Sequence, residues 1–130
     1  MLYGKPGASY AIQSSTTPGN AFAWTTLTRI PLAQSFVSVP VADLGQASIF
    51  YRAFEFKADP PLLEALLHPD QTRSLLLFGL PSLQYTLEYN GNVSNVAGWH
   101  PWLNYTLTNS YYPLNVPVTN GSIFYRLRKN

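Results

Sequence analysis

The pentapeptide Ser48-Ile49-Phe50-Tyr51-Arg52 occurs a second time, letter for letter, as Ser122-Ile123-Phe124-Tyr125-Arg126. Upstream, Leu2-Tyr3-Gly4-Lys5-Pro6 matches Leu77-Phe78-Gly79-Leu80-Pro81, and Trp24 matches Trp99. The early pairs are 75 residues apart (99 − 24) and the pentapeptides are 74 apart (122 − 48), so one residue has been lost between them. Matches in one order at one spacing indicate a duplicated unit. We therefore divide the chain into a first β-repeat (1–57), a linker (58–75) and a second β-repeat (76–130).

The composition predicts an all-β fold. Eleven prolines, eight glycines and sixteen Tyr and Phe residues (9 + 7) are typical of short strands joined by turns. Alternating apolar patterns predict four strands in each repeat. They cover residues 9–14, 24–30, 35–41 and 48–56, and then 84–89, 99–107, 111–118 and 122–128. Pro101, Pro113 and Pro117 place their strands at sheet edges or in bulges. We expect one antiparallel β-sandwich or two small ones, built by internal duplication.

The linker has its own pattern. Asp59 can cap a helix with Pro60 and Pro61 at its first positions, and the leucine-rich residues 62–67 predict a short helical turn that ends at His68-Pro69. The apolar run that follows, residues 73–78, predicts a buried strand leading into the second repeat. The first repeat shows no counterpart of that strand, so we expect an unpaired sheet edge near residues 2–10.

The charge distribution argues against several functions. Only 11% of the residues are charged, and the net charge of +2 includes a small basic cluster at the C-terminus. Nucleic-acid binding requires a larger cluster of Lys and Arg. No apolar run reaches the ~18 residues of a membrane span, so we expect no membrane insertion.

The residues also predict no catalytic chemistry. There is no cysteine, and the two histidines, His68 and His100, are too isolated for a metal site. The chain contains neither a Gly-x-Ser-x-Gly elbow nor a glycine-rich phosphate loop. We expect a protein that is not an enzyme and that has no cofactor.

The repeated strands carry a family resemblance. Tyr10-Ala11-Ile12-Gln13, echoed by Tyr85-Thr86-Leu87-Glu88-Tyr89, is similar to a strand of immunoglobulin-like or fibronectin type III-like sandwiches. The final Phe124-Tyr125-Arg126-Leu127-Arg128 resembles the ending of short repeats that close large extracellular bacterial proteins. The resemblance spans roughly residues 2–56 and 76–128, and it implies an extracellular or cell-surface location. Each copy is shorter than a full sandwich of ~100 residues, so the copies either complete each other or are minimal domains.

Paired aromatic and basic residues form the expected framework of the repeats. We expect each tryptophan to pack in the core, each arginine to lie over the tryptophan of its repeat, and each tyrosine to bond to main chain as in a tyrosine corner. These framework residues are Trp24, Trp99, Tyr51, Tyr125, Arg52 and Arg126.

Other aromatic residues are candidates for binding. Four of them occur only in the second repeat, where aromatic rings on a strand face can stack on sugars or fill a protein interface; ordinary core packing is the alternative. The candidate binding or interface residues are Trp102, Tyr105, Tyr111, Tyr112, Tyr3 and Tyr10. Three Asn-x-Ser/Thr sequons make Asn92, Asn104 and Asn120 glycosylation candidates in a secreted eukaryotic protein.

The sequence thus predicts a non-catalytic extracellular structural module that self-assembles or docks through sheet edges. Its expected partner is another copy of itself or another surface protein, in a filament, a surface layer or an adhesion component. Two alternatives remain: a carbohydrate-binding module that takes polysaccharide on the aromatic residues of the second repeat, and a passive spacer or decoration domain of a larger surface protein or virion.

Overall fold

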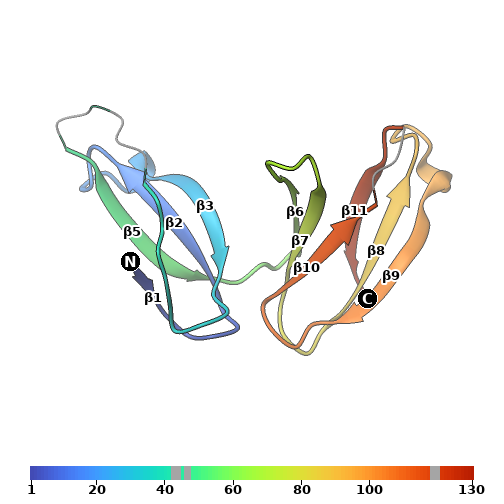
Figure 1. Ribbon diagram of the computed structural model, residues 1–130, viewed down its shortest axis with the longest axis horizontal. Helices are drawn as coiled ribbons and strands as arrows, with labels where there is room; N and C mark the ends of the chain where they lie inside the picture. Colours follow the sequence, from blue (N-terminus) through green and yellow to red (C-terminus); the bar gives the residue numbers. More distant parts are fainter. Residues whose placement is uncertain (42–44, 46–47, 118–120) are drawn as a thin grey trace. The chain divides into compact units, whose positions relative to one another are not determined.

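The computed structural model describes residues 1–41, 45, 48–117 and 121–130, and it is all-β, as predicted. The chain forms two compact units, unit 1 (Met1–Phe56) and unit 2 (Lys57–Asn130), which Figure 1 shows as two groups of strands. Gly45 predicts a turn at residues 43–46, and all of these residues except Gly45 lie outside the described ranges.

Unit 2 is a two-layered antiparallel sandwich. One sheet has the strand order β10-β7-β6 and the other has the order β11-β8-β9. Leu75 and Leu77 of β7 pack against Leu87 of β8, so the core lies between the two sheets. The strands are β6 (Leu62–Leu67), β7 (Arg73–Phe78), β8 (Gln84–Asn90), β9 (His100–Thr106), β10 (Tyr111–Val116) and β11 (Phe124–Lys129).

The linker corrects one prediction, because residues 62–67 form strand β6 and not a helical turn. All six residues of β6 pair antiparallel with β7, from Leu62 opposite Phe78 to Leu67 opposite Arg73. A tight turn joins the two strands, with the N–H of His68 donating to the carbonyl of Thr72 (2.9 Å). Leucine favours helices in isolation, but pairing with a neighbouring strand overrides so short a local preference. Asp59 caps no helix; its carboxylate lies 3.2 Å from Lys129 Nζ.

Unit 1 repeats part of this plan with one sheet much reduced. Its larger sheet has the order β3-β2-β5, and the second consists of β1 and β4, with two residues in each strand. Leu2, Ile12 and Leu32 form the buried core. The strands are β1 (Leu2–Tyr3), β2 (Ser9–Ser15), β3 (Thr25–Pro31), β4 (Phe36–Val37) and β5 (Phe50–Phe56).

The duplication is visible in the strand registers. In unit 1 the pairing shifts between Ile12 and Gln13, which leaves Leu27 without an opposite residue, and in unit 2 it shifts between Leu87 and Glu88, which leaves Trp102 without one. Leu27 and Trp102 are matching positions of the repeat (27 + 75 = 102). Both copies therefore carry the same β-bulge, and Pro101 lies beside it on edge strand β9, as the sequence predicted.

Candidate functional site: the open sheet edge of unit 1

Near the start of each repeat, a tyrosine side chain bonds to the main chain five residues before it. Tyr85 is almost fully buried, and its hydroxyl oxygen accepts a hydrogen bond from the N–H of Leu80 (2.9 Å). A Cβ on Gly79 would lie 2.7 Å from Tyr85 Cζ, so only glycine fits under the ring. In unit 1, Tyr10 accepts from the N–H of Lys5 (2.9 Å). The side-chain bond to main chain expected of Tyr51 and Tyr125 is thus made by another pair of tyrosines. Tyr10, a candidate for binding, has a structural role here.

The two predicted cation–π pairs are present. The Arg52 guanidinium lies 4.3 Å from the Trp24 ring centroid, and the Arg126 guanidinium lies 4.4 Å from that of Trp99. Each arginine also reaches across to the central strand of its sheet. Arg52 Nε donates to Gln13 Oε1 (2.8 Å). The arginine is therefore held between an aromatic face and a cross-strand acceptor in both copies.

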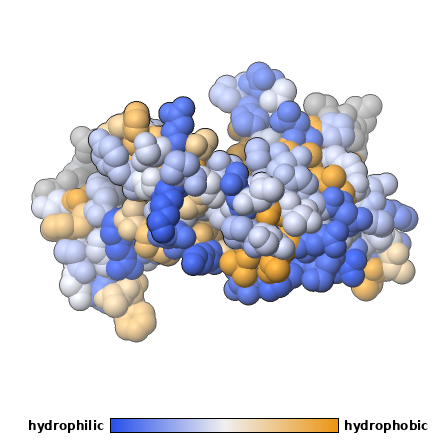
Figure 2. All heavy atoms as spheres, turned by 90° about the horizontal axis from the view of Figure 1, so that it is seen from below, coloured by the Kyte–Doolittle hydropathy of each residue, from blue (hydrophilic) through white to orange (hydrophobic). Residues whose placement is uncertain are grey.

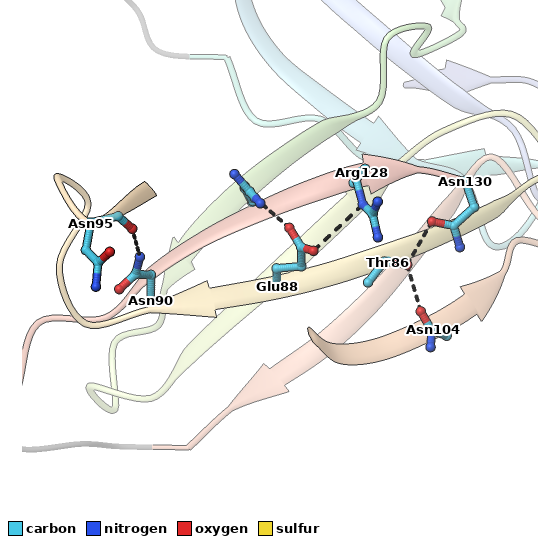
Figure 3. Close-up of polar contacts among 8 residues, drawn as sticks. Thr86, Glu88, Asn90, Asn95, Asn104, Arg128 and Asn130 are labelled. Atoms are coloured by element: carbon cyan, nitrogen blue, oxygen red, sulfur yellow. Dashed lines mark hydrogen bonds and ion pairs between the residues drawn. The ribbon is translucent and has the colours of Figure 1, made fainter. Parts of the chain in front are cut away.

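Unit 2 replaces that neutral acceptor with a carboxylate. Glu88 is buried, and Arg126 Nε donates to its Oε2 at 2.6 Å, while Arg128 Nε lies 3.7 Å from Oε1. Figure 3 shows Arg128 reaching Glu88 on the same sheet face. Two arginines thus compensate the buried charge. Further along β8, the Thr86 hydroxyl lies 2.7 Å from Asn104 Oδ1 and 2.8 Å from Asn130 Oδ1 (Figure 3).

The candidate binding aromatics do not form one flat platform. Tyr105 and Tyr112 stack on each other with centroids 3.9 Å apart, and Tyr112 packs against the core of unit 2. Tyr111 and Tyr112 are neighbours on β10, so their side chains point to opposite faces. In unit 1, Tyr3 is 71% exposed and packs beside Phe36 with a centroid distance of 6.1 Å.

Trp102 belongs to a different group. It packs against Tyr125 (5.6 Å between centroids) and, with Tyr89, Pro117 and Ile123, lines a hollow of about 190 Å³ in unit 2. Burial raises the pKa of the Tyr125 phenol above its ordinary value, although the positive charge of Arg73 opposes this shift. Trp102 is the bulged residue of β9 and its ring lies beside Tyr125 of β11, a contact that the sequence pattern did not reveal.

The three sequons lie in different settings. Asn92 is exposed in the turn after β8, and its Oδ1 accepts from the N–H of Ser94 (3.0 Å). Asn104 is exposed on edge strand β9 beside Thr86. Asn120 lies outside the described residues.

Strand β6 has two roles in unit 2, and both concern β7. β10 pairs with one edge of β7, and β6 pairs with the other edge, because β7 lies between β10 and β6 in the sheet. It also contributes Leu63, which lies opposite Leu77 and packs against the core cluster.

Strand β1 is a two-residue counterpart of the end of β7, which corrects the prediction that the first repeat has none, but the second edge of β1 is open. Among the described residues of the chain, β1 pairs only with β4 (Leu2 opposite Val37). The N–H of Gly4 donates to Ser35 O (2.9 Å), toward the β4 side. Because hydrogen-bonding directions alternate along an antiparallel strand, the N–H and carbonyl of Tyr3 face the open edge.

A hollow of about 350 Å³ lies beside this edge. We call it the unit 1 hollow; its lining is mostly apolar and consists of Met1, Leu2, Ile12, Val39, Val41, Tyr51, Arg52 and Ala53. Val41 is 50% exposed and Tyr51 is 42% exposed, whereas their counterparts Val116 and Tyr125 are packed against the unit 2 core. In unit 2 the corresponding position is covered by β6, and among the described residues no strand takes that place beside β1, so these side chains are more exposed in unit 1.

The two histidines of the chain contact neighbouring side chains in unit 2. Figure 2 shows the hydrophobic residues on its face in separate patches. His68 Nε2 lies 2.8 Å from Ser74 Oγ, and the His100 ring packs beside Tyr89. In the described part of the chain, no three His, Asp or Glu side chains are grouped to hold a metal ion.

No helix in the described ranges is long and apolar enough to cross a membrane.

Comparison with family models, with curated proteins and with solved structures finds no match to this chain.

Proposed function

We propose that the chain is a non-catalytic structural module of the extracellular space or cell surface that assembles through the open edge of β1. One observation carries the proposal: β6 covers β7 in unit 2, while the matching strand β1 pairs on one side only within the described residues. An edge with free main-chain groups beside an apolar hollow is a template for an added strand. The resemblance to repeats of extracellular bacterial proteins supports the location.

The chemistry of the edge favours assembly over catalysis. The unit 1 hollow offers seven apolar or aromatic side chains and one arginine, Arg52, which is already engaged by Gln13 and Trp24. Such a lining can bury apolar side chains of another polypeptide, and the main chain of Tyr3 can supply the hydrogen bonds. A filament, a surface layer or an adhesion component would use this kind of joint.

The test is the size of the protein in solution across a concentration series, by light scattering with electron microscopy of the same samples. Tyr3→Pro removes the N–H that faces the open edge and leaves pairing with β4 in place, since proline is tolerated on the outer side of an edge strand. Tyr3→Ala is the matched control, because it removes the ring but keeps the N–H. We expect oligomers from the natural chain and Tyr3→Ala, and a monomer from Tyr3→Pro. A monomer at every concentration for all three proteins would contradict the proposal.

A second candidate function is binding of a saccharide in unit 2. The observation that favours it is the hollow in which Trp102 lies with Tyr89 and Tyr125, because aromatic faces pack well on sugar rings. We expect Trp102→Ala to lose retention on insoluble polysaccharide while leaving assembly unchanged. Equal retention of both proteins would exclude this site.

A further inference from the structure

We infer that the occupant of the open edge is a strand of the β6 type: an extended segment that runs antiparallel to β1 and inserts a leucine-sized or larger side chain opposite Leu2. This inference rests on the proposed function and specifies the chemistry of the partner. The partner segment is another stretch of polypeptide, and β6 itself is not available for the purpose, since a tight turn ties it to β7.

The register follows from the duplication. Leu63 of β6 lies opposite Leu77, and Leu77 is the repeat counterpart of Leu2 (2 + 75 = 77). In the same way, Leu62 lies opposite Phe78, the counterpart of Tyr3. An incoming strand in this register places one residue against Leu2 with its side chain in the unit 1 hollow, and its next residue toward the C-terminus opposite Met1.

The size of the inserted side chain follows from the lining. Ala53, an exposed residue that lines the hollow, is smaller than its counterpart Leu127, and Val37, which packs against the unit 1 core, is smaller than its counterpart Tyr112. Leu63 fills its place in unit 2 even with the larger residues present. The hollow of about 350 Å³ therefore has room for a leucine or a larger apolar side chain. A polar or charged side chain inserted among these mostly apolar residues would lose its contact with water, which is unfavourable.

Position along β6 defines the rest of the partner. Leu67 lies on the same face of β6 as Leu63, but it is 66% exposed at the far end of the strand, opposite Arg73. The partner therefore needs an apolar residue at the position that faces Leu2 and tolerates polar residues at exposed positions. A peptide-binding screen against the chain should therefore select segments with this pattern of apolar and polar residues.

The test supplies the strand in the same chain. A copy of residues 58–75 is placed directly before Met1, so that the copied β6, its turn and the first residues of β7 run into β1 in register. Two variants accompany it, Leu63→Asp and Leu67→Asp, both made in the copied segment only. The natural chain and the three extended chains are compared by amide hydrogen exchange of Tyr3 and by light scattering.

We expect the Tyr3 amide to exchange at least tenfold more slowly in the extended chain and in its Leu67→Asp variant, and at the original rate in the Leu63→Asp variant. Unchanged exchange in the extended chain, or equal protection with Leu63→Asp, would overturn the inference. The two proposals fail separately. If the natural chain forms oligomers but the copied strand does not protect Tyr3, the proposed assembly is supported and the β6-type partner is contradicted. Protection of Tyr3 in a chain that is monomeric throughout supports the strand site and contradicts self-assembly.

Discussion

Replacement of Leu63 by alanine tests whether β6 belongs to the core of unit 2. The change removes three carbon atoms, worth about 2.4 kcal/mol at ~0.8 kcal/mol for each buried CH₂ group. Leu63 is only partly buried, which lowers this value, but the space left against Leu77 and Leu87 adds a cavity cost. We expect a loss of about 2 kcal/mol in the free energy of unfolding of unit 2. For a unit of 74 residues (130 − 57 + 1), that corresponds to a fall of about 8–16 °C in Tm.

The matched control is Leu67→Ala in the same strand. Leu67 is 66% exposed, so its truncation should change stability by less than about 0.5 kcal/mol. Urea and thermal unfolding of both variants, followed by NMR signals of β7 and β8, measure the difference. If residues 62–67 were a helical turn outside the core, both alanines would be neutral or stabilising, because alanine favours helices. Equal effects of the two substitutions would refute the role of β6 described here.

Three further predictions concern unit 2, and a glycine control accompanies the first. Gly79→Ala places a Cβ 2.7 Å from the Tyr85 ring and should cost about 1–3 kcal/mol, whereas Gly91→Ala, with no atom within 4 Å of its Cβ, should be neutral in the same unfolding assay. Glu88→Gln restores the neutral acceptor of unit 1 and should cost about 1 kcal/mol, the difference between a charged and a neutral hydrogen bond; a more stable variant would contradict the pairing. Hydrogen bonds from the hydroxyl and the N–H of Thr72 hold the pKa of Asp70 below its ordinary value of 3.8. The turn between β6 and β7 should therefore be fully stabilised above pH 3.8 and should lose this stabilisation as the pH falls through the lowered pKa. The protection of the turn amides against hydrogen exchange, relative to the intrinsic exchange rate at each pH from 6 to 2, measures this loss of stability. Asp70→Asn should remove the pH dependence of that protection.

Much of the fold could be predicted from the sequence, because alternating apolar residues and an internal repeat both produce periodic patterns. Alternation identified the strands around Tyr10 and Tyr85, and the repeat placed Arg52 and Arg126 over their tryptophans before any distance was known. The proline beside the bulge marked edge strand β9 for a local steric reason.

The sequence predictions were wrong or incomplete where the structure of a segment depends on the strands and side chains packed beside it. The leucine-rich segment 62–67 has a helical preference that pairing with β7 overrides, and alternation is hard to see in a run of leucines. The repeat pattern predicted the open edge near residues 2–10, but it did not predict the unit 1 hollow, because the hollow depends on how side chains such as Val41 and Ala53 line the space beside that edge. The sequence left open whether Trp102 joins three tyrosines on a binding face or packs in the core, and in the structure it packs against Tyr125.

The hairpin of β6 and β7 means that the repeat in the sequence and the unit in the fold are out of phase. The similarity of the two copies begins at Leu2 and Leu77, whereas unit 2 begins at Lys57, a strand earlier. A boundary drawn by similarity would thus fall inside β7 (Arg73–Phe78) and would remove β6, the strand that covers its edge. A fragment of residues 76–130 would inherit an open edge like that of β1, whereas residues 57–130 would keep theirs closed.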